Sequence, residues 1–171
     1  LNNRRSCVVP KFDKAVDDQC SKDKWLAIDK PVDIILFEGW CNNSPPQSAD
    51  ELKQAINELE KNEDAGGVWR QFVNDKLIEY RQKVFQYADI CIMLKAPDFE
   101  SVFSWRRLQE KKLRASVFSG AALKLMGDDE LKRFIQHFER ITRHTIEHLP
   151  TAADIVLPVE NDHSIRGIEL K

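Results

Sequence analysis

Four short apolar segments, separated by longer stretches with helical periodicity, constrain the fold of this chain most. The segments are residues 6–10 (SCVVP), 32–37 (VDIILF), 88–94 (ADICIML) and 153–159 (ADIVLPV). Each is apolar enough to be buried on both faces, which is typical of strands in a parallel sheet. Because helices are expected between the strands, the pattern predicts an α/β fold with β-α-β crossovers.

Helical patterns fill the intervals between these segments. Ser48 and Glu51 have the S-x-x-E spacing of a capping box, which predicts a helix that begins near residue 48. Acidic residues crowd the first turn of the last pattern and Pro150 follows its end, as expected for a helix. The three further helices are expected over residues 68–88, from Asp98 onward, and over 128–149.

The composition limits the size of the core and the class of partner. The chain has 171 residues, 42% of them hydrophobic, so we expect residues 1–171 to form a single domain or the larger part of one. A net charge of −2 argues against nucleic acid or an anionic membrane as the partner of the whole chain. The four cysteines form no C-x-x-C pair, and no signal peptide or apolar span of about 18 residues occurs. We therefore expect a cytoplasmic protein with free thiols.

An acidic residue, Glu38, follows the second apolar segment directly. In a parallel sheet the ligand crevice lies beyond the carboxyl ends of the strands, so this side chain is expected to project into the crevice and meet a metal ion or a proton. Gly39 lets backbone or ligand approach closely at that point, and Trp40 is a candidate wall of an acceptor pocket. The alternative is that Glu38 is an ordinary loop acid or a helix cap.

The third predicted helix is rich in basic residues. Arg107, Lys111 and Arg114 fall at i, i+4 and i+7, so one helix face presents three cations, with Arg106 beside them. Arginine supplies forked donors that suit phosphate, which makes this face a candidate phosphate clamp. The alternative is a solvated basic stripe.

Two weaker patterns are candidate ligand sites. His144 and His148 have the i, i+4 spacing that can chelate a metal, but the sequence indicates no third ligand, and surface histidines are ordinary. In the segment PKFDKA, the residues Lys11, Asp13 and Lys14 follow the first predicted strand. They form either an anion site with a carboxylate beside it or a plain loop.

Together, several segments resemble the D-glycerate 3-kinase family of P-loop kinases, relatives of uridine kinase, phosphoribulokinase and pantothenate kinase. The most specific are E-G-W after the second predicted strand, W-R-x-x-Q-E in the third helix and F-I-Q-H-x-E-R-I-T-R in the fourth. The resemblance implies a three-layer P-loop NTPase-like fold with a mainly parallel sheet. It also implies ATP and Mg²⁺ as ligands and transfer of the γ-phosphoryl group to a hydroxyl of a small acceptor such as glycerate.

The resemblance also assigns roles to individual residues. The implied catalytic residues are Glu38, Asp13, Arg106 and Arg114. The implied substrate-binding residues are Lys11, Lys14, Trp40, Asn74 and Gln109. Glu38 matches the acid of the Walker B strand, so it is the implied magnesium ligand, directly or through water, and residues of about 98–127 form a lid-like helical region.

One part of the family pattern is absent from the sequence. The chain has six glycines and no G-x-x-x-x-G-K-[ST] motif, so it lacks the nest of N–H groups that cradles the phosphates of ATP. Since the chain begins at Leu1, we expect that the first strand and the P-loop precede it and that this fragment alone is inactive. The alternative is a truncated or degenerate kinase fold that acts as a non-catalytic binding or interaction protein. The sequence predicts neither the acceptor nor the oligomeric state.

Overall fold

The computed structural model describes residues 6–13, 18–116 and 126–171, with the backbone alone for 113–116. The chain divides into two compact units, Leu1–Gly39 and Trp40–Lys171. The expectation of one domain over 1–171 with a lid-like region over about 98–127 stays a prediction.

The first unit contains short antiparallel strand pairs. β1 (Cys7–Val9) pairs with β4 (Leu26–Ile28), and β2 (Phe12–Asp13) pairs with β3 (Asp18–Gln19), while the short η1 (Lys22–Lys24) precedes β4. The strand expected at 6–10 is therefore confirmed, but its expected burial on both faces is wrong, because Val8 is 56% exposed. A strand that pairs with a nearby part of the chain is antiparallel and can leave one face in water.

The expected strand over 32–37 is also wrong: this segment is extended but forms no strand. Ile34 and Leu36 are each 85% exposed, where the sequence predicted burial. An extended segment becomes a strand only when a neighbour takes its N–H and C=O groups, and among the described residues no strand pairs with this one. Glu38 therefore follows an exposed extended segment and not a buried strand.

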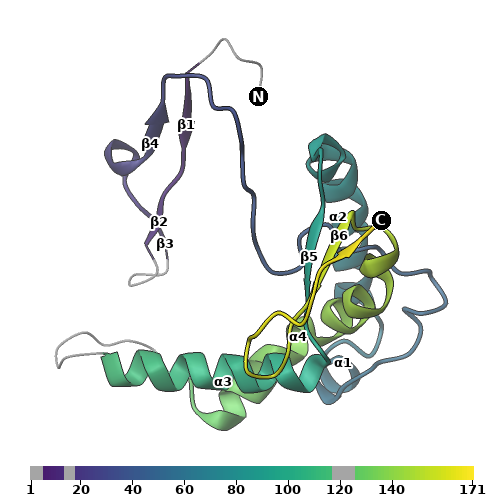
Figure 1. The fold of residues 1–171 in the computed structure, drawn as a ribbon. Helices are drawn as coiled ribbons and strands as arrows, with labels where there is room; N and C mark the ends of the chain where they lie inside the picture. The colour runs from purple at the N-terminus through teal and green to yellow at the C-terminus, as the bar shows by residue number, and fades with distance from the viewer. Residues whose placement is uncertain (1–5, 14–17, 117–125) are drawn as a thin grey trace. The chain divides into compact units, whose positions relative to one another are not determined.

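The second unit contains a three-stranded sheet in the order β5-β6-β7 (Figure 1). β5 (Ile92–Lys95) runs parallel to β6 (Ile155–Pro158), and β7 (Glu169–Leu170) is antiparallel to β6. These strands confirm the predictions at 88–94 and 153–159. The described part of the connection from β5 to β6 contains helices over residues 99–116 and 128–148, so the expected parallel crossover is confirmed as well.

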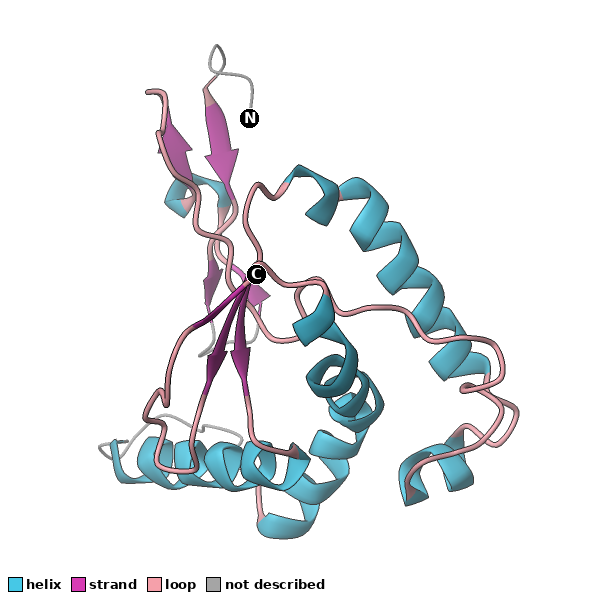
Figure 2. Cartoon of the chain, turned by 45° about the vertical axis from the view of Figure 1, so that its right-hand side comes forward, coloured by secondary structure: helices cyan, strands magenta, loops and turns pink. Residues whose placement is uncertain are grey.

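Helices make up most of the second unit (Figure 2). Their bounds are α1 (Glu58–Glu63), α2 (Val68–Lys83), η2 (Phe85–Tyr87), α3 (Phe99–Ser116), α4 (Asp128–His148) and η3 (Leu149–Thr151). The helices expected at 68–88, after Asp98 and at 128–149 are confirmed. None of the described helices is long and apolar enough to span a membrane.

The helix expected near residue 48 begins later than predicted. Glu51 accepts hydrogen bonds from the Ser48 N–H and hydroxyl at 2.7 and 2.6 Å, so the predicted capping contact is present. However, residues 49–52 form only a turn. The helix α1 starts after Asn57, whose side chain accepts a hydrogen bond from the Glu60 N–H at 2.9 Å. A local capping signal therefore shaped a turn without nucleating a helix.

Helix α4 connects the two clusters of the core. Leu131 and Ile135, both 1% exposed, pack with Phe99 of α3. At the other end of α4, Leu149 packs with Met93 of β5 and with two residues of the β6 region, Ala153 and Val156. One cluster therefore includes residues of α4, and the other includes Leu149, the first residue of η3 directly after this helix, so α4 links α3 to the sheet along the chain.

Two buried arginines hold the loop over residues 41–57. Arg140 donates to both carboxylate oxygens of Glu60 at 2.7 Å, and to the carbonyls of Glu51 at 3.0 Å and Gln54 at 2.5 Å. Arg70 donates to the carbonyl of Leu52 at 2.6 Å. Such bonds satisfy backbone groups that have no partner in a helix or sheet, so the loop has a defined path without regular secondary structure.

Candidate functional site

A groove of about 370 Å³ in the second unit brings together three of the predicted site residues: Trp40, Arg106 and Gln109. The other residues that line it are Val102, Trp105, Leu108, Lys112 and His163. The groove thus combines an apolar wall with cationic and amide groups, which is the composition expected of a pocket for a small polar molecule.

Helix α3 supplies one side of this groove. Val102, Trp105, Gln109 and Lys112 follow one another at helical spacing and therefore share a face. The Trp105 indole N–H donates to the carbonyl of Asn161 at 2.9 Å, and its ring lies 4.8 Å from that of His163. These contacts attach the segment after β6 to α3 and place His163 at the groove.

Trp40 supplies an aromatic wall. Its ring stacks on Phe138 of α4, with centroids 4.6 Å apart and an angle of 17° between the planes. Its indole N–H donates to the Thr142 hydroxyl at 3.2 Å. The side chain is thus held in one orientation while 43% of the residue stays exposed, so it presents a fixed apolar surface to a ligand.

Arg106 is oriented by its neighbours on α3. Its guanidinium group contacts a Glu110 carboxylate oxygen at 2.6 Å and donates to the Gln109 side-chain oxygen at 2.7 Å. The group also lies over the Phe134 ring, 5.7 Å from its centroid. Exposed Lys112 adds a second positive charge to the groove. An anionic ligand would therefore meet a guanidinium group that is already in position.

Glu110 has one carboxylate oxygen that Arg106 does not contact. This second oxygen is buried and has no hydrogen-bond partner among the described side chains. A buried carboxylate oxygen without a partner is costly, so the Arg106–Glu110 pair is a place where a further donor would stabilise the protein.

The predicted clamp face at Arg107, Lys111 and Arg114 is not the face that lines the groove. Arg107 donates to both carboxylate oxygens of Asp128, at 3.2 and 2.7 Å, at the start of α4. Lys111 is exposed. Arg114 belongs to α3, but its side chain lies outside the described residues. Its catalytic role stays a prediction.

Asn74 is buried, and its amide group contacts the loop. It accepts a hydrogen bond from the Gln47 N–H at 2.7 Å and donates to the Gln47 carbonyl at 3.0 Å. Both ends of the side chain are thus occupied by backbone, which explains its 6% exposure. Its predicted role in substrate binding stays a prediction.

The remaining predicted residues belong to the first unit. Glu38 and Lys11 are exposed, and the Lys11 carbonyl accepts a hydrogen bond from the Cys20 N–H at 2.8 Å. Asp13 of β2 lies opposite Asp18 of β3. Lys14 lies outside the described residues. The roles of these four predicted residues stay predictions.

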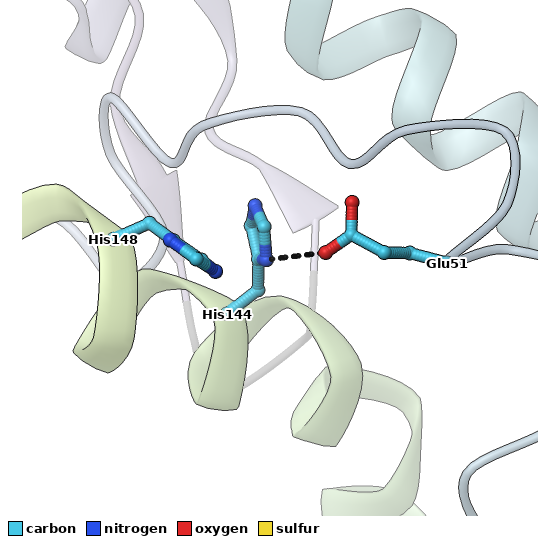
Figure 3. Close-up of side chains that lie close together, drawn as sticks. All are labelled: Glu51, His144 and His148. Carbon is cyan, nitrogen blue, oxygen red and sulfur yellow. Dashed lines mark ion pairs between the residues drawn. The ribbon is translucent and has the colours of Figure 1, made fainter.

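A second cluster joins His144 and His148 of α4 to Glu51 of the loop (Figure 3). The His144 Nδ1 atom lies 3.5 Å from a Glu51 carboxylate oxygen, and the two imidazole centroids are 4.2 Å apart. Burial, followed by the nearby His148, lowers the pKa of His144, which keeps this imidazole neutral at neutral pH. The sequence indicates no third ligand because Glu51 belongs to a distant segment that only the fold brings close.

The chain is similar in sequence to two kinases. It is 27% identical over 134 residues to the chloroplastic D-glycerate 3-kinase of Arabidopsis thaliana, and 29% identical over 136 residues to the uncharacterized kinase mug58 of Schizosaccharomyces pombe. Each match covers 76% of this chain, but only 26% and 46% of the two relatives. No family model matches the chain.

The structure is similar to a solved D-glycerate 3-kinase from Cryptococcus neoformans. The two share a TM-score of 0.71 and 21% sequence identity, over 97% of this chain and 60% of the solved one. This match shows the fold, and it confirms the predicted α/β architecture. Together with the two sequence matches, it confirms the resemblance drawn from the sequence motifs.

Proposed function

We propose that this chain, a relative of the D-glycerate 3-kinases, is part of an ATP-dependent kinase that phosphorylates a hydroxyl of a small, glycerate-like acceptor. The chain spans about a quarter and about half of the two curated relatives, so the activity is proposed for the whole protein that contains it. The 171 residues include no phosphate-cradling G-x-x-x-x-G-K-[ST] motif. The proposal therefore assigns to this chain the acceptor side and the lid of the site.

The observation that carries the proposal is the groove at Trp40, Arg106 and Gln109. A glycerate-like acceptor has a carboxylate, hydroxyl groups and a short carbon backbone. Lys112 offers positive charge to the carboxylate, and Arg106, whose charge is paired with Glu110, offers N–H donors to it. Gln109 offers an amide to a hydroxyl, and the fixed Trp40 ring covers the carbon atoms. Such fixed contacts would hold the acceptor for in-line attack, which is the main contribution that a protein makes to phosphoryl transfer.

Glu38 fits the role of a magnesium ligand by its chemistry. Mg²⁺ prefers oxygen ligands and is usually held by one or two carboxylates together with phosphates and water. Glu38 is an exposed carboxylate in the first unit, so it is open to such an ion or to its bound water. When bound, Mg²⁺ would neutralise charge on the phosphates of ATP.

The alternative is a non-catalytic protein with a kinase fold. Such a protein would have the same groove and would bind an anion there, but it would not transfer a phosphoryl group. Turnover in the whole protein therefore separates the two.

The test is an acceptor panel with the full-length protein, ATP and Mg²⁺. We expect ADP release that depends on a small hydroxy acid such as glycerate and exceeds that with uridine or pantothenate, with a phosphate ester detected by ³¹P NMR. Glu38→Gln keeps the side-chain shape but removes the charge, so we expect a rate at least about a hundredfold lower, roughly 2.7 kcal/mol, at an unchanged melting temperature. A folded protein that binds ATP but shows no acceptor-dependent ADP release would support the non-catalytic alternative.

A further inference from the structure

We infer that Glu51, His144 and His148 form a binding site for a divalent transition-metal ion of the zinc class. The three residues offer one ligand atom each, and these atoms lie within 4.8 Å of one another. Two imidazoles and one carboxylate are a common set of three protein ligands for Zn²⁺, which leaves the fourth position to water. This site is separate from the groove at Trp40 and does not depend on the proposed kinase activity.

The distances require only a small closure of the cluster. Ligand atoms of a tetrahedral site with bonds of about 2.0–2.2 Å lie about 3.4 Å apart, so the widest pair would approach by roughly 1.4 Å. The side chains of Glu51 and His148 are 42% and 46% exposed and can change rotamer, whereas that of His144, 10% exposed, is fixed by packing. Figure 3 shows His144 between the other two side chains, where it would anchor the ion.

The Glu51 carboxylate is already oriented for this role. One of its oxygens accepts hydrogen bonds from the Ser48 N–H and hydroxyl, while the other faces His144. Arg140 in turn donates to the Glu51 carbonyl, which fixes the backbone behind the side chain. Hydrogen bonds of this kind orient a ligand before the metal arrives and raise affinity.

The local electrostatics favour a cation. His148 is the last residue of α4, and the carbonyl groups at a helix C-terminus carry partial negative charge. Glu147 also lies beside His148, at 3.9 Å. Two arginines line a pocket together with Glu51 and His144. Of these arginines, Arg140 is paired with Glu60, and Arg143 is paired with Glu139 and with Glu100. Their charges are therefore largely balanced.

The ligand set selects the class of metal. Imidazole nitrogen suits Zn²⁺, Co²⁺, Ni²⁺ and Cu²⁺, whereas Mg²⁺ and Ca²⁺ prefer sites made of oxygen ligands alone. Binding would join the loop at Glu51 to the end of α4, so we also expect the metal to stabilise the fold.

The test uses the full-length protein, free of an affinity tag and stripped of metal, with Zn²⁺ in calorimetry and Co²⁺ in visible absorption. We expect Glu51→Gln and His148→Ala each to weaken Zn²⁺ binding at least about tenfold, to reduce the Co²⁺ band, and to abolish the rise in melting temperature caused by Zn²⁺. His144→Ala should do the same. Should that variant unfold, the two variants at exposed positions still decide.

His137→Ala is the matched control, because His137 lies on α4 as well but its ring contacts the Arg133 carbonyl and not the cluster. It should leave Zn²⁺ binding unchanged. Equal losses in the control and in the cluster variants would overturn the proposal. So would a loss with Glu147→Gln but not with Glu51→Gln, since that would move the carboxylate ligand to another residue.

Discussion

Replacing Arg140 by methionine should destabilise the protein strongly. Methionine fills much of the arginine volume but makes none of its hydrogen bonds, which reach both Glu60 oxygens and the carbonyls of Glu51 and Gln54. Arg140 and Glu60 are 7% and 8% exposed, so the substitution leaves a buried carboxylate without its counter-charge. Breaking a buried pair from one side costs about 3–5 kcal/mol.

This magnitude can be measured by urea unfolding and by calorimetry. For a chain of this size, each kcal/mol lowers the melting temperature by about 2–4 °C, so we expect a fall of roughly 6–20 °C. Arg143→Met is the matched control on the same helix. Its partners Glu100 and Glu139 form pairs at a side chain that is 46% exposed, so its loss should cost less than about 1 kcal/mol. Equal effects of the two substitutions would refute the view that Arg140 holds the loop.

Two further predictions concern titration. Burial would raise the pKa of Glu60, but hydrogen bonds from Arg140 and from the Ile56 N–H lower it on balance. Burial would also raise the pKa of Asp64, but the backbone N–H groups of Trp69 and Arg70, together with the Arg70 side chain, lower it on balance. These carboxylates stabilise the protein fully above their unfolded pKa values of 4.5 and 3.8, and this stabilisation is lost as the pH falls through their lower folded pKa values. Urea unfolding should therefore show that the free energy of unfolding falls below about pH 4.5, and that it falls less in Glu60→Gln. Burial raises the pKa of the Cys41 thiol to about 11, so at pH 8 this thiol should react with Ellman's reagent far more slowly in the folded than in the unfolded protein, and equal rates would contradict its burial.

The long helices were predictable from sequence because their signals are local. In α4 the acidic first turn, the apolar face with Leu131 and Ile135, and Pro150 after its end all indicate the same element. The strands β5 and β6 were predictable because each is a short apolar run, and they pair with each other in parallel, as such runs do in a buried sheet.

The errors arise where structure depends on distant partners. The segment 32–37 has the composition of a buried strand. Among the described residues, however, no strand pairs with it, and Ile34 is exposed. The contact between Ser48 and Glu51 was predicted, but the helix begins only at Glu58, because Arg140 and Arg70 hold the intervening residues in a loop.

The candidate site was partly predictable. Arg106 and Gln109 are three residues apart on one helix, so their proximity follows from the sequence. Trp40 is distant in the sequence, and its stack on Phe138 of α4 holds it at the same groove. The third ligand of the histidine pair, Glu51, could not be found from spacing, since it approaches α4 only through the fold of the loop.

The proposed kinase activity depends on the groove at Arg106 as the binding site for the acceptor of phosphoryl transfer. The most direct test measures kcat/KM for the acceptor in full-length Arg106→Ala and Arg107→Ala, each below its own melting temperature. Both substitutions remove one arginine from α3, but only Arg106 lines the groove, whereas Arg107 pairs with Asp128. We predict that Arg106→Ala lowers kcat/KM about a hundredfold, as for the loss of a charged hydrogen-bond partner of the acceptor carboxylate, and that Arg107→Ala stays near the wild type. Similar values for the two variants, or a larger loss with Arg107→Ala, would show that the groove at Arg106 does not bind the acceptor.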